Sequence, residues 1–192
     1  MPDFDRRRTK NQTIWAVEDV FSSDECVAMI AEIEAMGFEE ALITTGRGMV
    51  MNKSVRNNDR VIFDDPERAK SLFERLRAHM PSAIDNWSLV GLNERFRAYR
   101  YDVGQRFRPH FDGAFLRTPD VEESAITMMI YLNDDYAGGS TNFLDYEEVV
   151  TPKAGKVLFF FHPVLHEGCA VLEGRKYVLR TDVMYRVNTS PT

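Results

Sequence analysis

Four strand-like segments in the second half of the chain constrain its fold more than any other feature. From about residue 94, alternating or continuous apolar residues occur in the segments ERFRAYRY, AITMMIYL, KVLFFF and KYVLRTDVMYRV. Turns rich in Gly, Pro and Asp separate these segments, and no helical pattern lies between them. Short strands without intervening helices predict two packed sheets, as in a sandwich or jelly roll.

The first half of the chain predicts two helices that support this β core. One begins at the N-cap cluster of residues 22–24 and ends at Gly37, and the other follows Pro66 and runs to Pro81. The predicted buried faces contain Cys26, Ile30, Ile33 and Met36 in the first helix, and Ala69, Leu72, Phe73 and Leu76 in the second.

The expected fold class is therefore mainly β with flanking helices (α+β), with a sandwich or a jelly roll as the core. We expect a single domain over residues 1–192, with helical support over about residues 20–90 and the jelly-roll core over about residues 94–187.

Charge and composition narrow the classes of function. A net charge of −6 argues against general attraction to nucleic acids or membrane surfaces. No apolar run approaches the roughly 18 residues of a membrane span, and the first ten residues lack a secretory signal, so we expect a cytoplasmic protein. Cys26 and Cys169 fit no zinc pattern and are expected to be buried free thiols.

The segment His110-Phe111-Asp112, followed later by His166, is the most informative motif. Residues two apart in a strand point to the same side, so His110 and Asp112 can reach one metal while Phe111 faces the opposite way into packing. His166 is the preferred third ligand, with His162 as an alternative that spacing alone does not exclude. Two histidines and one carboxylate leave open metal positions, as in non-haem Fe(II) oxygenases. A lone His-x-Asp is more often a surface pair, so its neighbourhood must decide.

Three stretches around this motif occur in a characteristic order. They are YDVGQRFRPHFD (residues 101–112), YLN with GGSTNF (131–133 and 138–143), and HEGCAV with GRKYV (166–171 and 174–178). Together they resemble the prolyl 4-hydroxylase-type branch of the Fe(II)/2-oxoglutarate-dependent dioxygenases over about residues 95–186. The resemblance implies a double-stranded β-helix core, which is a cupin-like jelly roll. The chain departs from that pattern at Phe107, where tyrosine is frequent, and at Leu144, where proline is frequent.

The resemblance implies Fe(II) bound by His110, Asp112 and His166, with 2-oxoglutarate as co-substrate and O₂ as oxidant. It implies hydroxylation of an unactivated C–H bond, coupled to decarboxylation of 2-oxoglutarate to succinate. The expected substrate is a prolyl residue of a peptide or protein, with a small molecule as the alternative. The resemblance also suggests ascorbate as a reductant.

The resemblance also assigns residues to the co-substrate. Lys176 stands ten positions after His166, where the family has the cation that binds the distal carboxylate of 2-oxoglutarate. Arg180 is the second candidate, because it lies four residues further on and faces the same side of the strand. Tyr131 and Tyr101 match positions that contact the co-substrate or line the site.

Other interpretations of the sequence stay open. A cupin-like module could bind a metal or small acid without turnover, and a nucleic-acid demethylase is disfavoured by the acidic charge. The segment SVRNNDRVIF is either a solvated strand and turn or part of a substrate cleft. In a cleft, Arg56 and Arg60 would favour an acidic or amide-bearing substrate. The sequence does not predict the oligomeric state.

Overall fold

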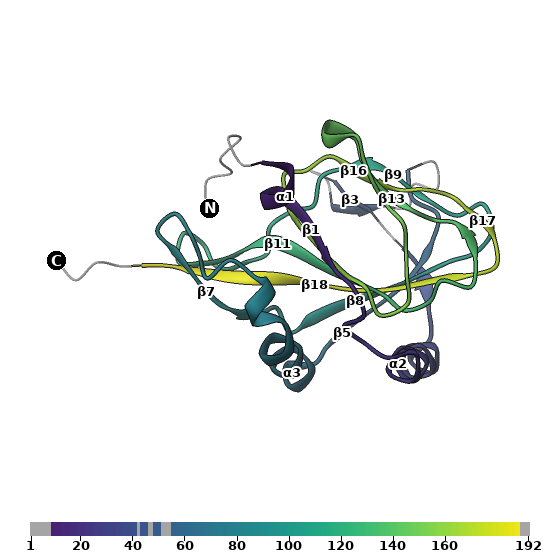
Figure 1. Ribbon diagram of the computed structural model, residues 1–192, viewed down its shortest axis with the longest axis horizontal. Helices are drawn as coiled ribbons and strands as arrows, with labels where there is room; N and C mark the ends of the chain where they lie inside the picture. Colours follow the sequence, from purple (N-terminus) through teal and green to yellow (C-terminus); the bar gives the residue numbers. More distant parts are fainter. Residues whose placement is uncertain (1–8, 42, 46–47, 51–54, 189–192) are drawn as a thin grey trace.

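Two antiparallel sheets lie face to face in the computed structural model, which describes residues 9–41, 43–45, 48–50 and 55–188 (Figure 1). The main path of the major sheet has the order β1 (Ile14–Val17), β15 (Val157–Phe161), β11 (Glu122–Tyr131), β18 (Lys176–Val187), β8 (Arg95–Tyr101), β5 (Asp59–Asp64) and β2 (Glu39–Glu40). The minor sheet has the order β14 (Glu148–Val150), β13 (Thr141–Phe143), β16 (His166–Gly168) and β9 (Phe107–His110).

From β8 onward the chain passes back and forth between the two sheets. Strands β8, β11, β15 and β18 belong to the major sheet, whereas β9, β13, β14 and β16 belong to the minor sheet. All pairings between these strands are antiparallel. This is the topology of a jelly roll, so the predicted fold class is confirmed.

Short elements extend this core. They are α1 (Lys10–Thr13), the paired β3 (Ile43–Thr45) and β4 (Gly48–Val50), η1 (Arg77–His79), β6 (Ala83–Ile84), β7 (Trp87–Leu92), β10 (Leu116–Thr118), β12 (Ala137–Gly138), η2 (Leu144–Tyr146) and β17 (Val171–Glu173). Strand β7 pairs with the C-terminal half of β18, and β12 pairs with β17.

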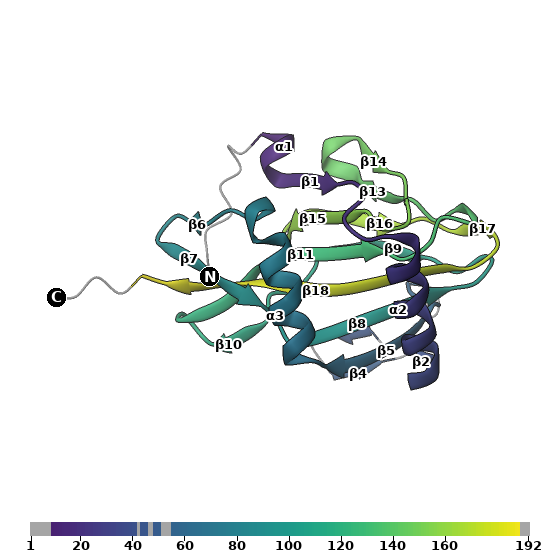
Figure 2. The same cartoon turned by 60° about the horizontal axis from the view of Figure 1, so that its bottom comes forward.

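Helices α2 (Ser23–Met36) and α3 (Pro66–Leu76) cover the face of the major sheet that points away from the minor sheet (Figures 1 and 2). Ser22 caps α2 in a capping box with Glu25, and the Asp65 side chain accepts a hydrogen bond of 2.9 Å from the backbone of α3. Both predicted helices are thus confirmed, although the 3₁₀ turn η1 replaces the last turn expected before Pro81.

The buried faces of the helices agree with the sequence pattern at five of the eight predicted positions, which are Cys26 and Ile33 in α2 and Ala69, Leu72 and Leu76 in α3. Ile30 and Phe73 are only partly buried, packed against the core. Met36, predicted to be buried, is 41% exposed because it is the final residue of α2 and the buried face already ends near Ile33.

Strand β8 is buried on both faces, which explains its imperfect alternation in the sequence. Phe96 stacks on Phe63, and the Arg68 guanidinium of α3 lies over both rings. On the opposite face, Tyr99 and Tyr101 line a cavity between the sheets. The central layer thus packs on helices on one side and builds a site on the other.

Two smaller expectations concern thiols and membrane spans. Both cysteines are free thiols as predicted, and Cys26 is buried, but Cys169 is only partly buried, which corrects the predicted burial. Within the described residues, no helix has the length and apolar character needed to cross a membrane.

Candidate metal centre

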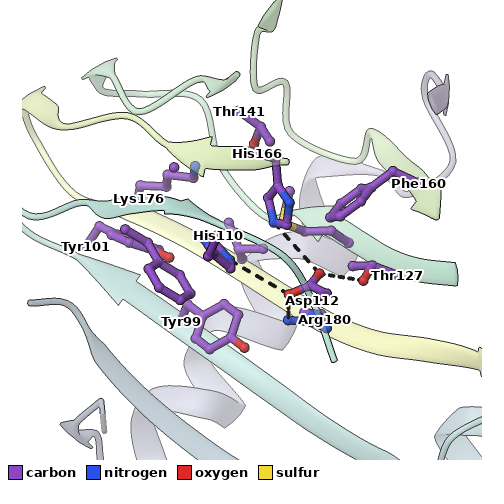
Figure 3. Close-up of a pocket in the computed structure, with 14 residues that line it drawn as sticks. Tyr99, Tyr101, His110, Asp112, Thr127, Thr141, Phe160, His166, Lys176 and Arg180 are labelled. Carbon is purple, nitrogen blue, oxygen red and sulfur yellow. Dashed lines mark hydrogen bonds and ion pairs between the residues drawn. The ribbon is translucent and has the colours of Figure 1, made fainter. Parts of the chain in front are cut away.

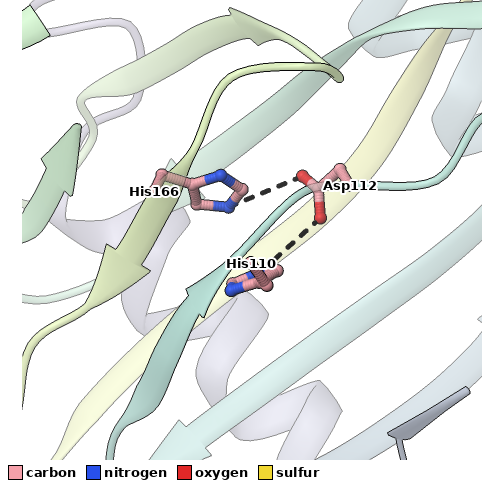
Figure 4. Close-up of side chains that lie close together, drawn as sticks. All are labelled: His110, Asp112 and His166. Carbon is pink, nitrogen blue, oxygen red and sulfur yellow. Dashed lines mark ion pairs between the residues drawn. The ribbon is translucent and has the colours of Figure 1, made fainter. Parts of the chain in front are cut away.

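Three side chains converge between the sheets at the end of β9 (Figure 4). His166 pairs with His110 across strands β16 and β9, and Asp112 lies two residues beyond the end of β9. The candidate ligand atoms of the three residues lie within 4.8 Å of one another. Each histidine Nε2 is 3.7 Å from one oxygen of Asp112. The structure therefore brings the three predicted ligands together.

Backbone carbonyls fix the orientation of both imidazoles. His110 Nδ1 lies 2.8 Å from the carbonyl of Arg108, and His166 Nδ1 lies 2.9 Å from that of Val164. Because a carbonyl only accepts hydrogen bonds, each Nδ1 donates its proton and each Nε2 keeps a free lone pair. Burial lowers the pKa of His110 to about 4 and also lowers the pKa of His166. Both rings are thus neutral and ready to coordinate a metal.

Two donors hold the carboxylate of Asp112. Thr127 Oγ1 donates a hydrogen bond of 2.6 Å to one oxygen, and Arg180 Nη1 donates one of 2.7 Å to the other. Burial alone would raise the pKa of Asp112, but the charge of Arg180 and the neighbouring imidazoles hold this pKa well below its usual range. Asp112 therefore presents a fixed negative charge to the space shared with the two imidazoles.

His162, the alternative third ligand, is engaged elsewhere. Its Nε2 lies 2.8 Å from Ser124 Oγ, and its Nδ1 lies 3.2 Å from Thr127 Oγ1. Since Thr127 also donates to Asp112, His162 supports the hydroxyl that positions the carboxylate. The cluster of candidate ligands contains His166 and not His162.

The prediction that Phe111 packs inward is wrong. Its side chain is 59% exposed. Strand β9 ends at His110, so the alternation of side chains does not continue to Asp112. Asp112 reaches the centre from a loop, where its backbone N–H donates to the carbonyl of His162 at 3.2 Å.

A cavity extends from this centre between the sheets, with Lys176 at its far side (Figure 3). Lys176 is only 3% exposed, and its Nζ donates a hydrogen bond of 2.5 Å to the carbonyl of Gly139. The same Nζ lies 5.4 Å from the ring centroid of Tyr101 and 5.3 Å from that of Tyr131. The hydroxyls of Tyr131 and Thr141 are hydrogen-bonded at 2.6 Å. Lys176, Tyr101 and Thr141 thus line this end of the cavity, whereas Tyr131 contacts Thr141 but is not itself part of the lining.

Lys176 and Arg180 both line this cavity, but they differ in whether a carboxylate neutralises their charge. Arg180 forms ion pairs of 2.7 Å with Asp112 and 3.1 Å with Asp182. Among the described residues, Lys176 has no carboxylate partner, and burial lowers its pKa to about 7. Of these two cations, only Lys176 therefore lacks a neutralising carboxylate among the described residues.

Arg56 and Asn58, from the segment SVRNNDRVIF, belong to the buried surroundings of the same site. Arg56 is 4% exposed and Asn58 is 1% exposed, so these residues do not form a solvated turn. Arg56 instead lines a cleft together with His110 and Asp112. Thr127 and Asp182 were not singled out from the sequence. A polar residue within the apolar run AITMMIYL was the available signal for Thr127.

Comparison with known proteins finds a similar family for the middle of the chain. Residues 96–181, which include all three candidate metal ligands, match the family model of the 2OG-Fe(II) oxygenase superfamily. The chain is also 31% identical over 104 residues to the prolyl 4-hydroxylase subunit alpha-1 of Bos taurus. That match covers 46% of this chain and 20% of the subunit, so it spans a fifth of the length of this curated relative.

Solved structures of prolyl hydroxylases share the fold of this chain. The viral collagen prolyl hydroxylase of Paramecium Bursaria Chlorella virus-1, in a 2OG complex, is 20% identical with a TM-score of 0.65, and the match covers 92% of this chain and 97% of that chain. A Trichoplax adhaerens prolyl hydroxylase, in complex with a hypoxia inducible factor oxygen degradation domain peptide fragment, is 16% identical with a TM-score of 0.69, and the match covers 89% of this chain and 83% of that chain. These likenesses support the jelly-roll fold.

Proposed function

We propose that this chain is an Fe(II)- and 2-oxoglutarate-dependent dioxygenase that hydroxylates a prolyl residue of a peptide or protein. The observation that carries the proposal is the placement of the His110–Asp112–His166 cluster beside a cavity that also holds the buried, unneutralised Lys176. The cluster fits a metal ion, and Lys176 fits a carboxylate of a dianionic co-substrate.

The donor set fits Fe(II). Two neutral imidazoles and one ionised carboxylate are the ligands of non-haem iron oxygenases, in which the remaining positions accept co-substrate and oxygen. His110, Asp112 and His166 would hold the metal through Nε2, carboxylate oxygen and Nε2. The carbonyls behind both imidazoles, and Thr127 and Arg180 behind Asp112, would keep these ligands in place.

The environment of Lys176 fits the distal carboxylate of 2-oxoglutarate. An isolated buried ammonium group is unfavourable. A carboxylate that enters beside Lys176 would keep this side chain protonated and would form an ion pair with it. Thr141 and Tyr131 would add hydroxyl groups at the same end. Arg180 is already committed to Asp112 and Asp182, which favours Lys176 for this role.

Iron and 2-oxoglutarate, when bound by these residues, would supply oxygen activation: one atom of O₂ would enter succinate, the other would become the substrate hydroxyl, and CO₂ would be released. The protein orients these reactants and limits the access of water. The ring centroids of Phe107 and His110 are 3.5 Å apart, and those of Phe160 and His166 are 4.5 Å apart. Aromatic rings therefore shield both imidazoles. Lys176 would bind a carboxylate of the co-substrate, whereas Arg180 holds the carboxylate of the candidate ligand Asp112.

A prolyl substrate is supported by the relatives, which include a prolyl 4-hydroxylase subunit and a prolyl hydroxylase bound to a peptide fragment. A cupin-like binding module is less well supported, because such a module needs no buried ammonium group beside its metal ligands. Ascorbate as reductant and a cytoplasmic location stay predictions.

The test is incubation of the iron-loaded protein with 2-oxoglutarate, O₂ and a panel of prolyl peptides. We expect succinate and peptide that has gained one oxygen atom in equal amounts, with ¹⁸O from ¹⁸O₂ in both products. Formation of succinate without any modified peptide would contradict the peptide substrate. Absence of succinate under all conditions would contradict the enzyme class.

A further inference from the structure

A second cavity lies beside the metal centre and carries an excess of positive charge. This cleft of 570 Å³ is lined by both sheets and includes His110 and Asp112. Four arginines line it: Arg56, Arg60, Arg97 and Arg180. The chain as a whole has a net charge of −6, so this concentration of cations is a local feature.

Only two of the four arginines are neutralised. Arg97 donates a hydrogen bond of 3.0 Å to Asp182, which also pairs with Arg180 at 3.1 Å. Arg97 and Arg180 stand directly opposite each other on β8 and β18, and like charges in that position destabilise a sheet. Asp182 compensates this pair, but no carboxylate among the described residues pairs with Arg56 or Arg60.

Arg56 is held rigidly and keeps an unused donor. Its guanidinium carbon lies 4.5 Å from the ring centroids of both Tyr99 and Phe107, so the cation is stacked between two aromatic rings. Its Nε donates a hydrogen bond of 2.7 Å to Asn58 Oδ1. Its Nη2 is buried and has no hydrogen-bond partner among the described residues. A buried donor without a partner is unfavourable, so a hydrogen-bond acceptor on a bound ligand would stabilise this nitrogen.

Arg60 supplies the second positive charge. It stands opposite Tyr99 in the β5–β8 pairing, on the face of the sheet that carries the metal centre. Burial, and then repulsion by Arg56, lower the pKa of Arg60, and the charges of Arg180, Arg56 and Arg97 outweigh burial and lower the pKa of Tyr99. Both effects show a positive potential in this cleft that an anion would relieve.

We propose that the substrate of this protein presents a carboxylate to Arg56 and Arg60 in the cleft beside the metal centre. The inference rests on the proposed function and specifies its substrate class as an acidic prolyl peptide. Two guanidinium groups suit the two oxygens of a carboxylate, and their charge-assisted hydrogen bonds are the strong class of such contacts. The carboxylate is either an acidic side chain near the prolyl residue or the free carboxyl end of the peptide.

The experiment compares peptides that differ only in a carboxylate. Asp or Glu next to the prolyl residue is compared with Asn or Gln, with both peptide ends blocked, and a third neutral peptide has a free carboxyl end. We expect a carboxylate to raise kcat/KM by about tenfold or more over its neutral counterpart, because one charge-assisted hydrogen bond is worth at least that factor. The peptide that shows the effect identifies the source of the carboxylate.

Variants test whether the two arginines cause this preference. Arg56→Gln and Arg60→Gln should each reduce the acid-to-amide ratio toward one, whereas Arg56→Lys should retain part of it. The control Arg77→Gln removes an exposed positive charge on η1, away from the cleft, and should leave the ratio unchanged. Binding of the same peptides to protein with Mn(II) in place of iron should follow the same order without turnover. Use of both Gln variants guards against misfolding of one.

The outcomes separate this inference from the proposed function. Binding of Fe(II) and 2-oxoglutarate without peptide, seen by the visible charge-transfer band, reports the enzyme class. A normal band with no preference for carboxylates in the wild type, or an unchanged ratio in both Gln variants, would overturn the substrate class alone. Absence of the band would overturn the proposed function and this inference with it.

Discussion

Lys176 and Arg180 face the same cavity from one strand, but only Arg180 is neutralised by carboxylates. Residues four apart in a strand share a face, which places both side chains beside the candidate metal ligands. Arg180 pairs with Asp112 and Asp182, whereas Lys176 contacts the carbonyl of Gly139. We infer that Arg180 orients a metal ligand and that Lys176 is reserved for the co-substrate.

Removal of the Lys176 charge should selectively weaken 2-oxoglutarate binding. We expect Lys176→Met to raise the KM for 2-oxoglutarate by about 10- to 100-fold, because one charge-assisted contact is lost. Initial rates of succinate formation at saturating iron and peptide measure the effect. Arg180→Gln is the matched variant, and it should chiefly weaken iron binding. If Arg180→Gln alone raised the KM for 2-oxoglutarate, the two roles would be reversed.

Binding of 2-oxoglutarate should depend on pH near neutrality. Burial lowers the pKa of Lys176 to about 7, so the free site loses its positive charge as the pH rises above 7. Tyr101 stays neutral in this range, because burial raises its pKa to about 12. We expect the Kd for 2-oxoglutarate to rise by up to about tenfold per pH unit above pH 7, with proton uptake on binding. Calorimetry in buffers of different ionisation enthalpy measures this uptake.

Lys176→Arg is the control for that pH dependence. A guanidinium stays protonated throughout this range, so the variant should bind 2-oxoglutarate without proton uptake between pH 7 and 9. Equal proton uptake in the wild type and Lys176→Arg would assign the titration to another group.

Lys176 should also reduce the stability of the protein without ligands. Its ordinary pKa of 10.5 is higher than the value of about 7 in the folded state, so protonation opposes folding. The penalty is complete below pH 7 and disappears as the pH rises toward 10.5. We expect Lys176→Met to raise the free energy of unfolding at pH 6 by roughly 1 kcal/mol or more, and by less at pH 9. Urea titrations of the iron-free protein at both pH values measure this. An equal change in the free energy of unfolding at both pH values, or a decrease at pH 6, would contradict it.

The hydroxyl of Thr127 should control the affinity for iron. Thr127→Val keeps the shape of the side chain but removes the donor that lies 2.6 Å from Asp112. We expect the affinity for Fe(II) to fall about 10- to 100-fold, as is typical when a group that orients a metal ligand is lost. Anaerobic iron titration measures the change. Thr13→Val replaces another buried threonine, in α1, and should bind iron normally. Equal losses in both variants would indicate a general loss of structure.

The candidate centre could be predicted from the sequence because its ligands are set by local spacing. His110 and Asp112 occur two residues apart, and His166 and Lys176 occupy a second short segment at a fixed distance. The choice between His166 and His162 needed the structure, because only the β9–β16 pairing places His166 opposite His110. Phe111 was misplaced because the end of a strand cannot be located from alternation alone.

The surroundings of the centre depend on contacts between distant segments. The burial of Arg56 results from packing between Tyr99 of β8 and Phe107 of β9, which no local pattern reveals. Likewise, the support of Asp112 by Thr127 depends on a loop that reaches across to β11. The jelly roll itself was readable because its strands are short, numerous and uninterrupted by helices.

Anaerobic titration with Fe(II) and 2-oxoglutarate tests the central claim most directly. The account predicts a weak visible charge-transfer band in the wild type that is lost in His110→Ala and needs more 2-oxoglutarate in Lys176→Met. Circular dichroism of the variants should confirm an intact fold. Admission of O₂ should then abolish the band and produce succinate. A band of full intensity in His110→Ala, or no band in the wild-type protein, would contradict the assigned metal and co-substrate site.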